Sequence, residues 1–104
     1  MLKSNEWIND LIVWYGSLLT ENQLNIMESY YQADLSLAEI AENNQVSRSA
    51  IHATIKRSEE LLLGYEAKLK VVEKFKERSK KYILLKDLKI SEVDKIVKDL
   101  EKIE

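Results

Sequence analysis

The sequence predicts an all-α protein, and three observations carry this prediction. The 104 residues include no proline and only two glycines, so the chain lacks most of the residues that interrupt helices. Hydrophobic residues recur every three or four positions, which is the period of a helix with one buried face. At two points a Thr or Ser stands three residues before a Gln or Glu, which marks a helix start. We therefore expect helices and no β-hairpin wing.

The first expected helix covers about residues 4–19 and is rich in aromatic side chains. Trp7, Trp14 and Tyr15 share it with five aliphatic residues at helical spacing. Large aromatic side chains in small helical domains usually belong to the core, and we favour that interpretation here. A docking surface for a partner is the alternative.

Two capping boxes predict where the next helices begin. In Thr20–Gln23 and in Ser36–Glu39, a hydroxyl can accept a hydrogen bond from the amide three residues later, while the Gln or Glu side chain reaches back. The helix after Thr20 is expected to stop near residues 33–34. The short helix after Ser36 is interrupted at residues 43–45.

Residues 35–42 and a helix capped by Ser47 have the pattern of a helix-turn-helix, whose second helix enters the DNA major groove. Ala41 is small where the two helices must cross, Val46 can fill the gap between them, and Ile51 points back to the core. The pattern supports this structural motif more strongly than it supports DNA binding, because helix-turn-helix units also dock proteins.

The outward face of that second helix carries the candidate nucleic-acid-binding residues. An arginine can bond guanine or phosphate bidentately, serine and histidine can bond base edges or phosphates, and a lysine offers a mobile phosphate contact. Any exposed helix can carry such residues, so a merely solvated face is the alternative. The candidate residues are Arg48, Ser49, His52, Lys56 and Arg57.

The helical pattern continues well beyond the motif. It keeps its phase to about Lys81, which predicts one long helix with a bend or break at Gly64, because a glycine inside a helix costs about 1 kcal/mol relative to alanine. A loop is expected at residues 86–90. Ser91 and Asp94 then resemble a capping box that opens a short last helix.

These elements suggest two parts. We expect a helix-turn-helix domain over residues 1–65, followed over residues 66–104 by a basic long-helix extension and a C-terminal helix. The second part either belongs to the same domain or forms a dimer interface. A helix of about thirty residues would be roughly 45 Å long, which is more than so small a domain can cover, so we expect a homodimer.

The formal net charge of −2 is a cancellation between segments. Residues 1–45 hold one Lys and seven acidic residues, residues 46–90 hold twelve Lys or Arg and six acidic residues, and residues 91–104 hold three Lys and five acidic residues. Within the basic middle, residues 68–81 hold seven cations and two carboxylates. Such a stripe can track phosphates, although charge runs are more often solvated helix faces.

The chain lacks the groups on which most catalysis depends, so we expect no enzyme and no cofactor. It has no cysteine, one histidine and no Gly-rich loop, which excludes a thiol nucleophile, a multi-histidine metal site and a phosphate cradle. Nothing in it approaches the ~20 apolar residues of a membrane span. A chain without cysteine suits a reducing compartment, and we expect a cytoplasmic protein.

The motif residues resemble known proteins. Leu19-Thr20, Ser47–Ile51 and Ile55–Glu59 are similar to region 4 of bacterial sigma factors. With Trp14–Thr20 before them and Leu62–Leu69 after them, the chain is more similar to the YlxM family of helix-turn-helix proteins, over roughly residues 5–80. In two places it departs from the family pattern.

The departures lie in the turn. Asn44 stands where the family usually has an apolar residue, and Gln45 stands where glycine or asparagine would ease a left-handed backbone, so we expect a strained or differently shaped turn. The resemblance implies a small cytoplasmic regulator associated with the signal recognition particle pathway. The implied partners are nucleic acid, either DNA or RNA, and the particle's protein, RNA or receptor.

The rival hypothesis is a protein-interaction module. Such a module would dock on signal recognition particle components through the aromatic first helix or the tail, without sequence-specific DNA binding.

Overall fold

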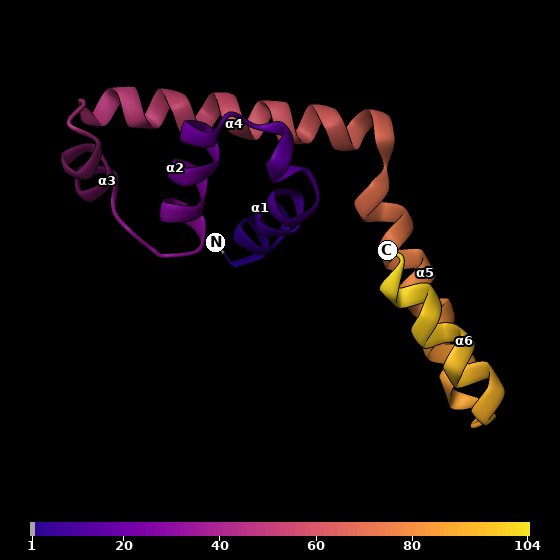
Figure 1. Ribbon diagram of the computed structural model, residues 1–104. Helices are drawn as coiled ribbons and strands as arrows, with labels where there is room; N and C mark the ends of the chain where they lie inside the picture. The colour runs from indigo at the N-terminus through magenta and orange to yellow at the C-terminus, as the bar shows by residue number, and fades with distance from the viewer. Residues whose placement is uncertain (1) are drawn as a thin grey trace. The chain divides into compact units, whose positions relative to one another are not determined.

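The computed structural model describes the backbone of residues 2–104 and the side chains of residues 5–104. Within that range every regular element is helical (Figure 1), so the predicted all-α class is confirmed. The elements are α1 (Leu2–Tyr15), the 3₁₀ turn η1 (Gly16–Leu18), α2 (Glu21–Tyr31), α3 (Leu37–Asn44), α4 (Arg48–Leu69), α5 (Val71–Asp87) and α6 (Ser91–Lys102).

The chain divides into two compact units, one that ends at Val72 and one that runs from Glu73 to Glu104. The first unit contains α1 to α4 and the first two residues of α5. The second unit contains the rest of α5 and α6.

Both predicted capping boxes are present. The Thr20 hydroxyl accepts from the Gln23 amide at 3.1 Å, and the Gln23 side chain accepts from the Thr20 amide at 3.0 Å. Ser36 and Glu39 make the same pair of bonds at 3.1 and 2.9 Å. The hydrogen bonds from the Ser36 amide and hydroxyl lower the pKa of Glu39, so this carboxylate stays charged at the start of α3, where the helix dipole favours it.

Helix α4 organises the core of the first unit. Helices α1, α2 and α3 lie on one side of it and all contact it (Figure 1). Trp7 and Trp14 pack partly buried against this core and Tyr15 is fully inside it, so the core interpretation of the aromatic first helix is confirmed. The buried core residues are Ile8, Leu11, Ile12, Tyr15, Leu19, Ile26, Met27, Ile40, Ala41, Ile51, Ile55, Leu62 and Val72.

Helix α4 is shorter than the sequence pattern predicts. It ends at Leu69, and Lys70 adopts a left-handed backbone with φ 54° and ψ 31° before α5 begins. The predicted continuous helix to Lys81 is therefore wrong. Gly64 is not the break either, because it lies inside α4 with open space where a Cβ would stand.

A buried hydrogen-bond network explains why the break falls at Lys70. The Tyr15 hydroxyl donates to the Glu66 carboxylate at 2.5 Å and accepts from the Val71 amide at 3.0 Å. Glu66 also accepts from the Val72 amide at 3.1 Å. Side chains of α1 and α4 thus satisfy the first amides of α5, which a continuous helix would have paired with α4 carbonyls.

The same network keeps the Tyr15 hydroxyl protonated. Glu66 is only 8% exposed, and a buried carboxylate is costly unless it accepts hydrogen bonds. Burial raises the pKa of Tyr15, and its hydrogen bond to Glu66 raises the pKa further. Tyr15 therefore remains a neutral hydroxyl donor at physiological pH.

In the second unit, α6 runs back alongside α5 (Figure 1). The Tyr82 hydroxyl donates to Glu104 at 2.9 Å, Arg78 forms an ion pair with the same carboxylate, and Lys86 lies 3.1 Å from Glu101. The last helix thus folds back onto α5 within this unit.

Three predictions about this region are wrong. The loop is only Leu88–Ile90, because α5 continues to Asp87. Ile90 is the residue that precedes α6 and it makes no side-chain cap, whereas Ser91 is already helical and cannot cap. The predicted basic stripe does not lie on one helix, because the chain is interrupted at Lys70 between its α4 and α5 members.

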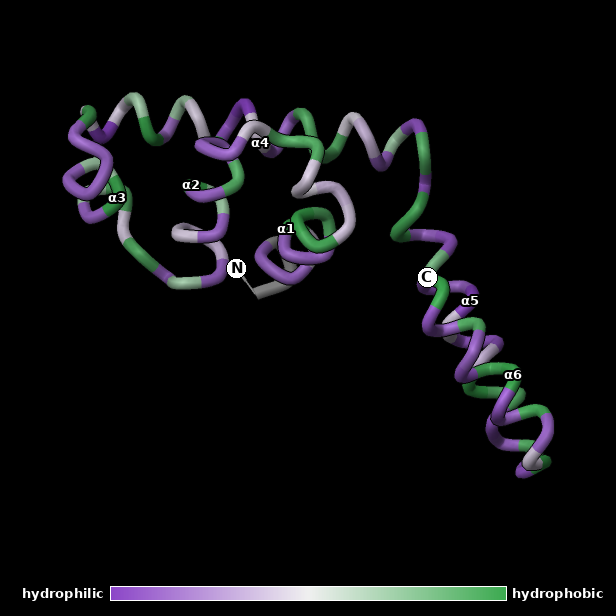
Figure 2. Tube along the Cα trace, in the orientation of Figure 1, coloured by the Kyte–Doolittle hydropathy of each residue, from purple (hydrophilic) through white to green (hydrophobic). Residues whose placement is uncertain are grey.

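Most large hydrophobic side chains of the second unit are exposed to solvent. Figure 2 shows hydrophobic and hydrophilic residues alternating along both of its helices. Tyr82 and Val97 are its buried hydrophobic residues, since two helices alone cannot enclose a core. Its exposed large hydrophobic residues are Ile83, Leu84, Leu85, Leu88, Ile90, Ile96, Leu100 and Ile103.

The network at the α4–α5 junction gives a stability prediction. Tyr15→Phe removes one hydroxyl, and with it the hydrogen bond that this group donates to the Glu66 carboxylate and the one that it accepts from the Val71 amide. We expect a loss of about 1–3 kcal/mol in the free energy of unfolding, measured by urea denaturation. Tyr65→Phe is the matched control at a half-buried tyrosine of α4, and it is expected to change stability by about 0.5 kcal/mol or less. Equal effects of the two changes would contradict the role of the network.

Candidate nucleic-acid interface

Helices α3 and α4 form the helix-turn-helix, and the turn between them closes with a hydrogen-bonded Schellman motif. The Val46 amide donates to the Ala41 carbonyl at 3.1 Å, and the Gln45 amide donates to the Glu42 carbonyl at 3.2 Å. The backbone of Gln45 is left-handed, with φ 55° and ψ 43°. The left-handed backbone expected at this residue is therefore present, at a position where glycine is the usual residue.

The two neighbours of Gln45 behave differently from each other. The Asn44 side chain donates to the Ile40 carbonyl at 2.7 Å, so its polar group is satisfied on its own helix. Val46 is 47% exposed and does not fill the gap between the helices, contrary to the prediction. Ile40 and Ala41 fill it instead, because the Schellman turn directs the chain at residue 46 outward.

Ser47 begins α4 as predicted. Its hydroxyl accepts from the Ala50 amide at 3.1 Å and lies 3.2 Å from the Ser49 hydroxyl. The other first-turn amides of α4 have no carbonyl partner within the helix. This end of the helix carries partial positive charge, which favours an anion such as phosphate.

The two faces of α4 have separate roles. One face is buried at a spacing of three or four residues, and it includes Ser58, whose hydroxyl donates to the Thr54 carbonyl at 2.7 Å. All of the candidate nucleic-acid-binding residues are exposed. The buried residues of α4 are Ile51, Ile55, Ser58, Leu62 and Glu66.

Helical geometry groups most of the candidate residues. Arg48, His52 and Lys56 are spaced four residues apart and form one row along α4, with Ser49 beside it. We call this row the cationic stripe, after its two charged residues; it is distinct from the basic run at residues 68–81. Arg57 follows Lys56 directly and so lies about 100° further round the helix. The structure therefore brings four of these side chains to one side of α4 and places Arg57 on another.

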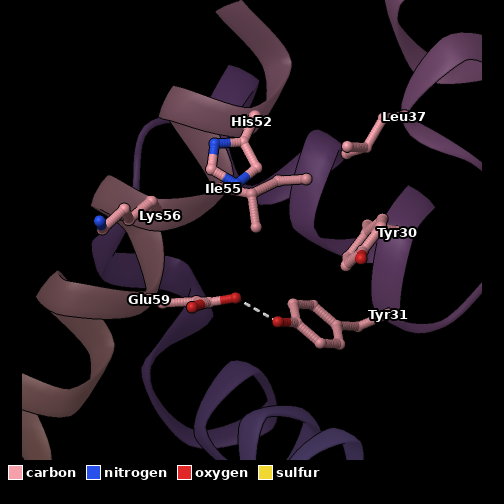
Figure 3. A pocket seen from close by; sticks show the side chains of 7 residues that line it. All are labelled: Tyr30, Tyr31, Leu37, His52, Ile55, Lys56 and Glu59. Carbon is pink, nitrogen blue, oxygen red and sulfur yellow. Dashed lines mark hydrogen bonds between the residues drawn. The ribbon is translucent and has the colours of Figure 1, made fainter. Parts of the chain in front are cut away.

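Two hollows flank His52. The first, of about 440 Å³, lies between α3 and the start of α4 and is lined by Leu37, Arg48, Ser49 and His52. The second, which we call the Tyr30 hollow, has a volume of about 290 Å³ and lies between α2, the start of α3 and α4 (Figure 3). Its lining residues are Tyr30, Tyr31, Leu37, His52, Ile55, Lys56 and Glu59.

A tyrosine–glutamate hydrogen bond fixes one side of the Tyr30 hollow. The Tyr31 hydroxyl donates to the Glu59 carboxylate, which Figure 3 marks by a dashed line. Burial raises the pKa of Tyr31, and the bond to Glu59 raises it further, so the hydroxyl remains a donor. The ring of Tyr30 meets that of Tyr31 edge-on at 4.9 Å between centroids.

Sequence reasoning missed the tyrosines, Leu37 and Glu59 as members of a site. The only local signal is the Tyr30-Tyr31 pair at the end of α2, which equally well indicates core packing. The hollow forms only because the end of α2 packs beside the middle of α4, and no spacing rule within one helix shows such a contact.

Other kinds of site have no support in the part of the chain that the structure describes. No group of three or more His, Asp or Glu residues is placed there to hold a metal ion. Among the described helices none is long and apolar enough to cross a membrane.

The capped turn, the two-faced second helix and the exposed cationic stripe define a helix-turn-helix protein. The chain belongs to the UPF0122 family, described as "Putative helix-turn-helix protein, YlxM / p13 like", which matches residues 2–103. The resemblance to the YlxM family is thereby confirmed, and it extends past residue 80 into the last helix.

Bacterial relatives carry the same family name. The chain is 43% identical to a UPF0122 protein of Clostridium acetobutylicum over 92% of its own length and 90% of that protein. It is 51% identical to one of Desulforamulus reducens over 79% of its length and 70% of that protein. For a UPF0122 protein of Bacillus cereus the identity is 43%, over 99% and 93% of the two chains.

Proposed function

We propose that this chain is a helix-turn-helix regulatory protein that binds nucleic acid through the outward face of α4. The supporting observation is the division of α4 into two faces. The core occupies one face, while the cationic stripe and the N-terminus of the helix are left for a polyanion. The residues proposed to bind nucleic acid are Arg48, Ser49, His52, Lys56 and Arg57.

Each proposed residue has a contact suited to its chemistry. Arg48, in the first turn of α4, is placed to reach a guanine edge or a phosphate bidentately. Ser49 and His52 offer hydrogen bonds to base edges or phosphates, and Lys56 offers a phosphate contact one turn further along. Arg57, on another side of the helix, is better placed for the sugar-phosphate backbone than for a base.

The wider role follows from the family. We propose a cytoplasmic, non-enzymatic protein without a cofactor, which acts in or around the signal recognition particle pathway. The resemblance to the YlxM family supplies that pathway, and the described geometry is compatible with either DNA or RNA as the target. The particle's protein, RNA or receptor would then be its partner.

The two parts of the chain are proposed to divide these tasks. Residues 1–65 hold the nucleic-acid-binding motif, and residues 66–104 supply the contact between two copies of the chain. The row of exposed hydrophobic residues on α5 and α6 supports a homodimer, because a second hairpin of the same kind would bury them in a four-helix arrangement.

The same exposed residues favour one form of the rival function. A protein-interaction module that docks on signal recognition particle components would use the α5–α6 hairpin rather than α1. The tryptophans of α1 pack against the core of their own unit, whereas Ile96 and Ile103 are 61% and 81% exposed.

Substitutions on α4 test nucleic-acid binding. Lys56→Ala is expected to weaken binding of a DNA or RNA duplex equally across sequences and to lower the slope of log K against log salt by about 1, because one phosphate contact is lost. Arg48→Ala is expected to cost about 1–3 kcal/mol if it contacts a base. Lys98→Ala on α6 is the matched control and should change neither quantity. Wild-type affinity and salt slope in both α4 variants would show that the assignment is wrong.

Sedimentation equilibrium tests the homodimer. We expect the wild-type chain to have twice its sequence mass at tens of micromolar. Ile96→Asp should shift it toward monomer, because dimerisation would bury an unpaired carboxylate among apolar side chains, which is costly. The neighbouring exposed position gives the control, Lys95→Asp, which should leave the mass unchanged. A monomeric wild-type chain at that concentration would exclude this proposal.

A further inference from the structure

The Tyr30 hollow adjoins the outward face of α4 and differs from it in chemistry. His52 and Lys56 belong to both surfaces, so a ligand bound along the cationic stripe passes the mouth of the hollow. Inside it, the side chains of Tyr30, Leu37 and Ile55 offer apolar surface (Figure 3). The hollow therefore combines a cationic rim with an apolar interior.

The volume of the Tyr30 hollow restricts which ligands it can hold. Sites for complete small molecules generally have volumes of about 300–1,000 Å³, and this hollow of about 290 Å³ is at or below the lower limit of that range. One flat ring system fits such a volume better than a whole nucleotide does. Tyr30 and Tyr31 line one side of the hollow and Lys56 and Glu59 line the opposite side (Figure 3).

The charges inside the hollow discriminate between parts of a nucleic acid. The Glu59 carboxylate repels a phosphate, but it can accept hydrogen bonds from the exocyclic amine of adenine or cytosine. One carboxylate oxygen of Glu59 accepts the hydrogen bond from the Tyr31 hydroxyl, and this bond fixes the position of Glu59 in the hollow. Lys56 at the rim attracts the phosphate that the interior rejects.

We propose that the Tyr30 hollow binds a single unstacked nucleobase that carries an exocyclic amine, so that the target is a nucleic acid with an unpaired base next to a duplex. This inference rests on the proposed nucleic-acid function and specifies its substrate class. The duplex contacts the α4 stripe, and the unpaired base turns into the hollow against the aromatic ring of Tyr30.

The first test compares two RNA hairpins that differ by one unpaired adenine in the stem. We expect the bulged hairpin to bind roughly fivefold more tightly or better, because stacking on an aromatic side chain contributes about 1–3 kcal/mol per base. Tyr30→Leu should remove this preference and leave the affinity for the fully paired hairpin unchanged. Tyr65→Leu, at a half-buried tyrosine outside the hollow, is the matched control and should retain the preference.

The second test does not depend on removing a packed ring. Replacing the bulged adenine by uracil removes the amine, and we expect the wild-type affinity to fall about fivefold, which corresponds to about 1 kcal/mol of base discrimination. Glu59→Gln should reduce this discrimination, since the amide can bond either base, while Glu60→Gln at the next, exposed position should not.

The outcomes separate the two proposals. Equal affinity for bulged and paired hairpins, with the salt dependence expected for the α4 stripe, would overturn the base-binding hollow and leave the nucleic-acid function standing. A failure to bind either hairpin at low salt would overturn both. Loss of the bulge preference in Tyr30→Leu and of the adenine–uracil discrimination in Glu59→Gln, with both controls unaffected, would support the hollow as the base site.

Discussion

The packing of α4 against α1, α2 and α3 is the constraint on which the rest of the first unit depends. Its buried side chains recur every three or four residues from Ile51 to Glu66, so one face of the helix is committed to the core. The rest of the helix surface has to be exposed, and there the chain places its cationic stripe. The fold therefore presents Arg48, His52 and Lys56 as a consequence of how the core is built.

The C-terminal end of α4 depends on the same core. Glu66 is the last buried residue of the helix, and its carboxylate is shared by the Tyr15 hydroxyl and the Val72 amide. This network ends α4 at Leu69 and begins α5 at Val71. The backbone of Lys70 between them is left-handed, which is unfavourable for a residue with a side chain. Hydrogen bonds between side chains and backbone thus determine the length of the proposed recognition helix.

Local chemistry determined which features the sequence could predict. The capping boxes at Thr20 and Ser36 and the Ser47 cap use residues three apart, so their spacing alone reveals them. The left-handed Gln45 was predictable from the family pattern. The break at Lys70 was not, because the hydrophobic period continues unbroken from α4 into α5, and the bonds that end α4 come from a tyrosine 51 residues before Glu66.

The candidate site also combines features that nearby residues reveal with features that depend on contacts between distant parts of the chain. Its α4 residues could be predicted because a helix with one buried face must expose the other. The Tyr30 hollow could not, since it joins the end of α2 to the middle of α4 by tertiary contact. Ser91 shows the opposite error, in which a plausible capping pattern lies one residue inside the helix that it was expected to begin.

The central claim is that nucleic acid contacts the outward face of α4, and amide NMR mapping tests it most directly. A short duplex is titrated into the isotope-labelled full-length chain, and the shift of each backbone amide is followed. The account predicts that the largest shifts cluster at residues 47–57 and diminish as salt is raised. Shifts confined to α5 and α6, with residues 47–57 unchanged, would contradict it.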